Sequence, residues 1–455
     1  MTCLLLAKLG WTPPGAQLSS ENATVSKHMN PVHKMSDPPL RESLEVDNAA
    51  PPRKEYKKPK SITFALDEEL GAPAATRGAT LPTPSRLTPV FARSLTASHL
   101  SDPSEREEGL LQSLPVGTNG LALGLCGLAG VCKELVDRGL NLTVVPYWIA
   151  MFFATLLWLA FTARVCATPR ARLRLEATKP QLCFAYGAYQ MTYLFVLVRV
   201  VALPCPACVG PGIHLGAAAQ VAVIVAFLAS CWAAGLKPEP LWNPPTVNCA
   251  VTTIAGVATL GAGHWLVRAS LWYAMGLQVL LVPWQVWRTV RDPDVAPNCA
   301  VSMMQAPCSL NALTFAVVRR GAALQGLGAV LLGDARAEQA LCHALFAIAT
   351  LVFWLTLYCL WARRGPILER GFDLSFVALT FPSCSTAIAG LQYASPPDRA
   401  GSSGASGPLL LALRAYAFAV AGAVAVTVVV VALGCAKIAA GEARRRSRPR
   451  KPTAT

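Results

Sequence analysis

Charged side chains are scarce in this chain, and acidic ones are nearly missing from its apolar part. Of its 455 residues 14% are charged, whereas a soluble globular protein has about 25%. Residues 115–434 hold 20 Lys and Arg but only 11 Asp and Glu. All the acids fall in predicted loops or at predicted helix ends: Glu134, Asp137, Glu176, Glu239, Asp292, Asp294, Asp334, Glu338, Glu369, Asp373 and Asp398. A carboxylate in hydrocarbon is costly and is kept mainly for function, so this lack argues against a cation pathway, although helical membrane proteins exclude acids in general.

Signatures of enzymes and metal sites are also missing. The six histidines are dispersed, at His28, His33, His99, His214, His264 and His343. There is no HExxH motif, nucleophile elbow or Walker loop. Most of the 15 cysteines lie in apolar stretches, where they act as small buried hydrophobes. The single CxxC pair, Cys205 and Cys208, favours an outer-loop disulfide or two free thiols over a redox pair or half a zinc site. We therefore predict no enzymatic activity, no cofactor and no metal.

Apolar stretches, in contrast, are abundant. Ten of them are long enough, or nearly so, to cross a bilayer as a helix, which takes roughly 20 residues. Their predicted ranges are 115–131, 146–166, 181–203, 213–235, 246–264, 269–290, 299–318, 339–361, 373–393 and 409–433. The sequence thus predicts an all-α membrane protein with ten transmembrane helices in a domain spanning residues 115–434.

Two polar tails flank this predicted domain. Residues 1–114 hold 13 basic and 13 acidic residues, are rich in Pro, Ser and Thr, and are predicted to be a disordered cytosolic regulatory tail. A basic run ending at Ser61 is either a kinase target, a contact for anionic lipid or simply a solvated charge run. Residues 435–455 hold 7 basic residues and 1 acid and are predicted to be a basic cytosolic tail. Because the basic excess lies on a membrane domain and its tail, we expect no nucleic-acid partner.

Basic residues in the loops predict the orientation. With the N-terminus inside, the inner loops carry eleven Lys and Arg and the outer loops seven, as the positive-inside rule requires. The basic run Arg444–Lys451 strengthens this bias, because an even number of spans places both tails on one side. The sequon at Asn141 then faces outward as a candidate glycosylation site. We expect a multi-pass protein, of the plasma membrane, with both termini cytosolic.

The odd-numbered stretches differ from the even-numbered ones. The odd ones contain proline, glycine and hydroxyl residues, in the runs PVGTNGLALGL, NPPT, QAPCS and TFPSCST, whereas the even ones are uniformly apolar. A proline inside a membrane helix removes a hydrogen bond, and the freed carbonyl needs protein or water as a partner. The alternation predicts an inner ring of five kinked helices and an outer ring of five straight ones. Alternatively, the small residues merely allow helices to pack closely.

The four motifs give the chain a family resemblance over residues 115–433. In order and spacing they resemble the tellurite-resistance/dicarboxylate-transporter family, which includes the slow-type anion channels of plant guard cells and falls in the voltage-dependent anion channel superfamily. The resemblance implies ten helices, a central pore within the five odd ones, a phenylalanine gate and trimeric assembly. The chain departs from the family pattern in three places: Cys308 replaces a usual proline, and Thr253 lies near a usual Gly-Asn pair. The third segment lacks its usual proline, so Gly187 is expected to permit the bend there.

The resemblance identifies Phe381 as the pore gate, where its ring would block a constriction by bulk and by excluding water. From the residues alone, a packing contact beside Pro382 is the simpler interpretation of Phe381. The candidate pore-lining residues are Pro115, Gly117, Gly120, Gly187, Arg199, Thr253, Pro307, Pro382 and Thr386. Arg199 is the best candidate for a cation in the pathway, although a cation near a helix end often extends to lipid phosphate instead.

The sequence therefore predicts an anion channel or transporter for small inorganic or organic anions of the chloride, nitrate and malate class. Its predicted partners are anions, the lipid bilayer, further copies of the chain in a homotrimer, and a protein kinase acting on the N-terminal tail. Two alternatives stay open: a proton-coupled carrier of dicarboxylates or sulfite, and a membrane scaffold or sensor that transports nothing.

Overall fold

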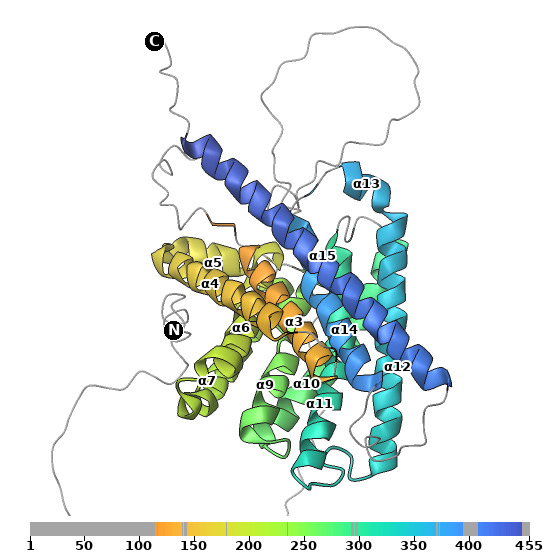
Figure 1. Ribbon diagram of the computed structural model, residues 1–455. Coiled ribbons are helices and arrows are strands. Elements are labelled where there is room, and N and C mark those ends of the chain that lie inside the picture. Colours follow the sequence, from red (N-terminus) through yellow and green to blue (C-terminus); the bar gives the residue numbers. More distant parts are fainter. Residues whose placement is uncertain are drawn as a thin grey trace, which may run out of the picture. The chain divides into compact units, whose positions relative to one another are not determined.

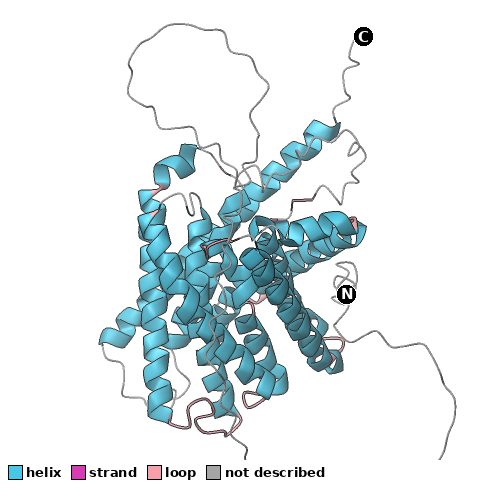
Figure 2. Cartoon of the chain, turned by 180° about the vertical axis from the view of Figure 1, so that it is seen from behind, coloured by secondary structure: helices cyan, strands magenta, loops and turns pink. Residues whose placement is uncertain are grey.

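The computed structural model describes residues 114–447, apart from 116, 139, 141–142, 179, 234, 293–294, 296–298, 370–371, 373 and 395–407. All of these residues belong to one structural unit of the chain. Every regular element in this described part is helical, as Figure 2 shows. The predicted N-terminal tail with Ser61, and the sequon residue Asn141, lie outside it.

Eight helices in the described part are long and apolar enough to cross a bilayer, and they cover eight of the ten predicted segments. The first, second and third segments are α3 (Thr118–Asp137), α4 (Val145–Ala167), and α6 (Pro180–Val196) continued by the π-helix η2 (Leu197–Val201). The fourth and sixth are α7 (Val209–Ala233) and α10 (Trp265–Arg291). The remaining three are η6 (Cys299–Gln305) with α11 (Ala306–Leu324), α12 (Ala335–Ala362) and α15 (Pro408–Ser447).

The fifth and ninth segments are not among these eight helices, so the predicted count of ten spans is not confirmed in the described part of the chain. The fifth consists of the 3₁₀ turn η4 (Pro240–Trp242), α8 (Asn243–Val247) and α9 (Cys249–Leu260). The ninth is the 3₁₀ helix η7 (Leu374–Leu379) followed by α14 (Thr380–Ala394). Each α-helical piece is too short to cross a bilayer alone, because it takes roughly 20 residues to do so.

The motif prolines lie where a 3₁₀ segment passes into an α-helix. Pro244, Pro307 and Pro382 all lie in the first turn of an α-helix that follows a 3₁₀ segment. In the first helical turn proline removes no intrahelical hydrogen bond, so it starts a helix without straining it. The sequence predicted bent helices at these motifs; the structure instead begins a new α-helix at each one.

Three shorter elements complete the described part. These are α5 (Arg170–Thr178), the 3₁₀ turn η3 (Pro206–Cys208) and α13 (Arg364–Glu369). Cys205 and Cys208 form a disulfide, which decides between the two predictions for this pair. Helix α15 continues past residue 434, so the predicted basic tail begins as helix.

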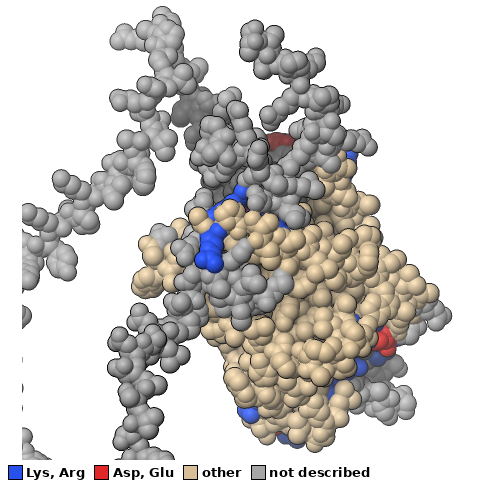
Figure 3. Space-filling view, turned by 90° about the vertical axis from the view of Figure 1, so that its left-hand side faces the viewer, with Lys and Arg blue, Asp and Glu red and all other residues tan. Residues whose placement is uncertain are grey.

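Burial separates odd-numbered from even-numbered segments. Burial was compared over the most apolar 18 residues of each span. The buried share is 61% in α3, 67% in α6–η2 and 89% in η6–α11. It is only 28 to 44% in the even-numbered helices α4, α7, α10, α12 and α15. Exposed tryptophans lie near the ends of the even helices, at Trp148, Trp232, Trp265, Trp284, Trp287 and Trp361. Such end positions are typical of side chains at the membrane–water interface. In Figure 3 uncharged residues form a broad band on one face, with Lys and Arg toward its margins.

A glycine seam joins the first and ninth segments, whose helices α3 and α14 adjoin in Figure 1. Four glycines of α3 face four side chains in register: Gly120 faces Val377, Gly124 faces Thr380, Gly127 faces Cys384 and Gly130 faces Ile388. Both numberings rise together, so the two segments run parallel. A Cβ atom at Gly120 would lie 2.7 Å from Cγ1 of Val377, so a larger residue has no room. For these glycines the close-packing interpretation holds.

Candidate functional site: an apolar cavity among the odd-numbered segments

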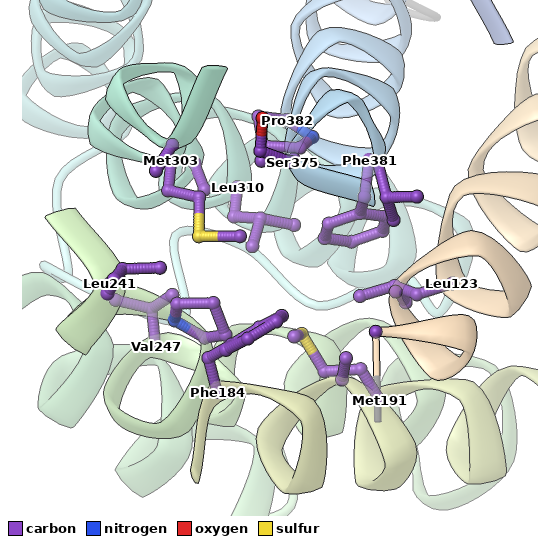
Figure 4. Close-up of a pocket in the computed structure, with 18 residues that line it drawn as sticks. Leu123, Phe184, Met191, Leu241, Val247, Met303, Leu310, Ser375, Phe381 and Pro382 are labelled. Atoms are coloured by element: carbon purple, nitrogen blue, oxygen red, sulfur yellow. The ribbon is translucent and has the colours of Figure 1, made fainter. Parts of the chain in front are cut away.

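A cavity of about 40 Å³ lies where the odd-numbered segments meet (Figure 4). Its lining residues belong to α3, α6, η4, α8, η6, α11, η7 and α14. All of these elements belong to odd-numbered segments, and α4, α7, α10, α12 and α15 contribute no residue to the lining that the structure describes. The cavity is therefore enclosed by the five odd-numbered segments, four of which carry the proline, glycine and hydroxyl motifs.

The wall of the cavity is apolar. Figure 4 shows Phe184 and Met191 opposite Met303 and Phe381, and Ser375 is the only polar side chain among the lining residues. One water molecule needs about 10–15 Å³ in this measure of volume, so the space holds about three waters at most. Apolar walls give those waters few hydrogen-bond partners, so the cavity favours a dry state.

Phe381 lies at one end of this cavity. Its side chain is 7% exposed, and its ring packs edge to face on the ring of Phe195, with 6.2 Å between centroids. A Cβ atom at Gly127 of α3 would lie 3.4 Å from Cδ2 of Phe381, which is about van der Waals contact, so α3 passes directly beside the ring. Met191, one turn before Phe195 on α6, is the last residue of that helix in the lining. The two rings thus cap the cavity toward the C-terminal ends of α3 and α6.

Sequence reasoning missed Phe195, although the sequence contained a signal. Phe184, Ala188, Met191 and Phe195 follow one another at intervals of four, three and four residues. This spacing places them on one face of a helix, so the face that begins in the cavity continues to the Phe381 ring.

The structure brings four predicted site residues to the cavity. Gly117, Gly120, Phe381 and Pro382 line it. Six do not: Pro115, Gly187, Arg199, Thr253, Pro307 and Thr386. Pro307 follows the lining residue Ala306, and the carbonyl of Pro115 accepts a hydrogen bond from the Thr118 amide at the start of α3.

Gly187 is a close-contact glycine rather than a bend. A Cβ atom on it would lie 2.6 Å from the carbonyl carbon and oxygen of Pro244 and from the nitrogen of Pro245. Helix α6 runs unbroken through Gly187, and its geometry changes only at η2. The third segment therefore packs directly on the NPP backbone of the fifth.

Most hydroxyls of the odd-numbered segments act as structural ties. Thr253 Oγ1 donates to the carbonyls of Cys249 and Val267, and Thr386 Oγ1 donates to that of Pro382. Between the seventh and ninth segments, Ser302 Oγ donates to the Ala378 carbonyl at 2.6 Å, and the Ser309 and Ser385 hydroxyls lie 2.6 Å apart. These bonds hold the cavity walls together without lining the cavity.

Arg199 lies beyond the aromatic pair. It follows Phe195 by one turn, in the π-helical stretch η2, and is half-buried near Cys126 of α3. Within the described residues no acid forms an ion pair with it. π-Helical turns occur frequently at functional sites. A cation without a bound counter-charge thus lies on the far side of Phe381 from the cavity.

Two α-helices begin at the cavity wall. Ala306, the first residue of α11, and Phe381 and Pro382, in the first turn of α14, all line it. A helix N-terminus carries roughly half a positive charge and free N–H groups, and broken membrane helices use such ends to hold anionic groups. These two helix ends therefore contribute positive partial charge to the wall of the apolar cavity.

A buried ion pair lies at the opposite end of α6. Arg164 of α4 binds the Glu176 carboxylate through Nη1 and Nη2, at 3.0 and 2.6 Å, and Tyr186 of α6 donates to the same carboxylate at 2.7 Å. Arg164 Nε also donates to the Leu114 carbonyl at 2.9 Å. Burial alone would raise the pKa of Glu176, but the hydrogen bonds and charge of Arg164 hold that pKa below its usual range. This cluster ties α4, α5 and α6 to the chain that enters α3.

Helices with exposed apolar faces and interfacial tryptophans, around a cavity closed by buried broken segments, define a multi-pass helical membrane protein. A sequence profile of the voltage-dependent anion channel family matches residues 113–436, which is more than two thirds of the chain. The chain therefore belongs to the voltage-dependent anion channel family, in agreement with the resemblance found from its motifs. Members of this family are channels and transporters of anions in membranes rather than enzymes. No curated protein matches the chain significantly.

Proposed function

We propose that small anions of the chloride, nitrate and malate class cross the membrane along the odd-numbered segments and through the cavity, and that Phe381 is the gate. The observation that carries this proposal is the origin of the lining: five separate odd-numbered segments, and none of the even-numbered helices in the described part, enclose one cavity. Its end is capped by the residue that the family resemblance identified as the gate.

The proposed closed state rests on two effects. The Phe381 and Phe195 rings block the route by bulk, and the apolar wall disfavours the water that an anion needs around it. Opening requires the Phe381 ring to leave Phe195, which widens the route and admits water. In the open state the N-termini of α11 and α14 and the charge of Arg199 favour anions over cations.

Replacing the gate ring tests this proposal. Phe381→Ala is expected to increase anion current at least tenfold, since a barrier lowered by about 1.4 kcal/mol raises a rate about tenfold. Phe195→Ala is expected to act in the same direction. Voltage-clamp recordings with measured surface expression give the result.

The matched control is Phe353→Ala on α12, where a phenylalanine of equal burial, 8% exposed against 7% for Phe381, lies outside the cavity lining. Its anion current is expected to stay at the wild-type level. Equal currents in Phe381→Ala, Phe353→Ala and wild type, at equal surface expression, would exclude the gate.

The excess of seven basic residues over one acid in 435–455 and the loop bias also lead us to propose that both termini are cytosolic and that the protein lies in the plasma membrane. Homotrimeric assembly and a kinase acting at Ser61 remain proposals of the same kind. Two measurements separate the rival functions. Flux that collapses without a proton gradient favours a coupled carrier. Flux that persists after deletion of residues 1–114 favours a transporter over a scaffold or sensor.

A further inference from the structure

The C-terminal end of α12 carries a hollow on its exposed face. The hollow measures about 590 Å³ and is lined by Trp354, Leu357, Tyr358, Leu360, Trp361 and Arg364. The three aromatic side chains are 54, 66 and 65% exposed, so the described part of the chain leaves them largely uncovered. Trp354 to Ala362, the last residue of α12, covers eight helical steps, or about 12 Å, and Arg364 follows as the first residue of α13. The hollow thus spans most of the roughly 15 Å of hydrocarbon in one leaflet.

A fixed positive charge closes this hollow at its polar end. The guanidinium of Arg364 lies over the Trp361 ring, with 4.1 Å from Cζ to the ring centroid. Arg364 Nη1 also donates to the Trp361 carbonyl at 3.0 Å. Among the described residues no acid pairs with Arg364. The charge of Arg364 is therefore held in place, and the other N–H groups of its guanidinium can donate to a ligand.

The neighbouring helix end repeats the arrangement. Arg363 Nη2 donates to the Thr289 carbonyl at 2.7 Å, which fixes the end of α12 beside the end of α10. There Arg291 lies over Trp287, with 4.9 Å from Cζ to the centroid. Two adjacent helix ends thus each present an arginine supported by a tryptophan.

A tryptophan at the end of a membrane helix lies at the headgroup level, and an arginine there reaches lipid phosphate. An arginine at each of these two helix ends favours a headgroup with net negative charge over a zwitterionic one. Each basic residue near an anionic leaflet contributes about 1 kcal/mol to binding, which is a factor of about five. The aromatic and aliphatic wall from Trp354 to Trp361 suits the acyl chain of the same molecule.

We propose that the ends of α10 and α12 form a binding site for one anionic phospholipid, with its phosphate at Arg364 and an acyl chain in the hollow. The lipid site depends on the membrane placement of the helices and not on the proposed gate. Failure of one proposal therefore leaves the other unaffected.

Native mass spectrometry of the purified full chain, titrated with phosphatidylglycerol or phosphatidylcholine, tests this site. Wild type is expected to retain phosphatidylglycerol in preference, and Arg364→Gln is expected to weaken that retention about tenfold through loss of a charge-assisted contact. Arg336→Gln is the matched control, because it removes an exposed arginine at the end of α12 that lies farthest from the hollow. It is expected to bind as wild type does.

Four results would overturn the proposal. The first is equal retention of the two lipids by wild type, and the second is unchanged phosphatidylglycerol binding by Arg364→Gln. The third is displacement of the lipid by millimolar inorganic phosphate alone, which would make the ligand a free ion. The fourth is a Trp361→Cys crosslink between two chains in lipid-supplemented membranes, which would show that a second copy occupies the hollow.

Discussion

Gly187 illustrates at the residue scale how tightly the cavity wall is built. The backbone of Pro244 and Pro245 occupies the place where its side chain would be. Backbone cannot rotate away as a side chain can, so Gly187→Ala is expected to destabilise the protein by about 1–3 kcal/mol through overpacking. Gly276→Ala on α10 is the control, because nothing lies within 4 Å of a Cβ atom there. The unfolding temperature in detergent should fall for Gly187→Ala but not for Gly276→Ala. Equal unfolding temperatures of the two variants would contradict a close contact between Gly187 and the Pro244–Pro245 backbone.

Glu176 has a predicted effect on stability and on its pH dependence. Glu176→Gln leaves Arg164 buried without a counter-charge, and breaking a buried pair in this way costs about 3–5 kcal/mol. Because the pKa of Glu176 is held below its ordinary value of 4.5, the pair stabilises fully above that pH and is lost as the pH falls through the lowered pKa. Wild type should therefore lose stability below about pH 4.5 by a step that Glu176→Gln lacks.

The control for this prediction is Glu369→Gln, which changes an exposed carboxylate. It should keep the acid-induced step. The double variant Arg164→Met/Glu176→Leu should be more stable than Glu176→Gln, since an apolar pair leaves no buried charge. Identical pH profiles for wild type and Glu176→Gln would show that the ion pair does not stabilise the fold.

At the scale of elements, α10 is fastened to two odd-numbered segments by amide pairs. The side chains of Asn243 and Gln285 donate to each other, both at 2.9 Å, and Asn243 also donates to the Met303 carbonyl. Two turns earlier on α10, Gln278 accepts from Asn311 at 2.7 Å. In an apolar surrounding these bonds have no water to replace them, so they join an even-numbered helix to the cavity wall.

Gln285→Leu is expected to cost about 1–3 kcal/mol, because it leaves the buried Oδ1 of Asn243 without its hydrogen-bond donor. Val279→Ala, on the exposed side of the same helix, should change stability by no more than about 0.5 kcal/mol. Thermal unfolding followed by tryptophan fluorescence compares the two variants. A Gln285→Leu protein as stable as Val279→Ala would mean that the amide pair is dispensable.

The sequence predicted the segments better than their internal breaks. Long apolar runs such as α4 and α12 were found because their period and composition are unmistakable. The breaks near Asn248 and Thr380 were missed, since a proline motif indicates a disturbed helix but not whether the chain bends or restarts. The role of Gly187 was also out of reach, because the Pro244–Pro245 backbone it touches is more than 50 residues away and only the tertiary fold brings them together.

At the scale of the whole molecule, the alternation of motif-bearing and uniformly apolar segments corresponds to buried and exposed helices. Helices that face lipid and helices that face other helices need different residues, so composition alone separated the exposed even-numbered segments from the buried odd-numbered ones. Composition did not reveal the dry character of the cavity. The hydroxyls of Ser302, Ser309 and Thr253 are polar in the sequence but bond to neighbouring segments in the structure.

The most direct test of the account is anion flux through the purified full chain in liposomes. Chloride, nitrate and malate are offered in turn, sodium efflux is followed in parallel, and wild type is compared with Phe381→Ala and Phe353→Ala. The account predicts anion flux without sodium flux, a rise in Phe381→Ala and no change in Phe353→Ala. Vesicles that leak sodium while retaining all three anions, in wild type and in Phe381→Ala alike, would contradict it.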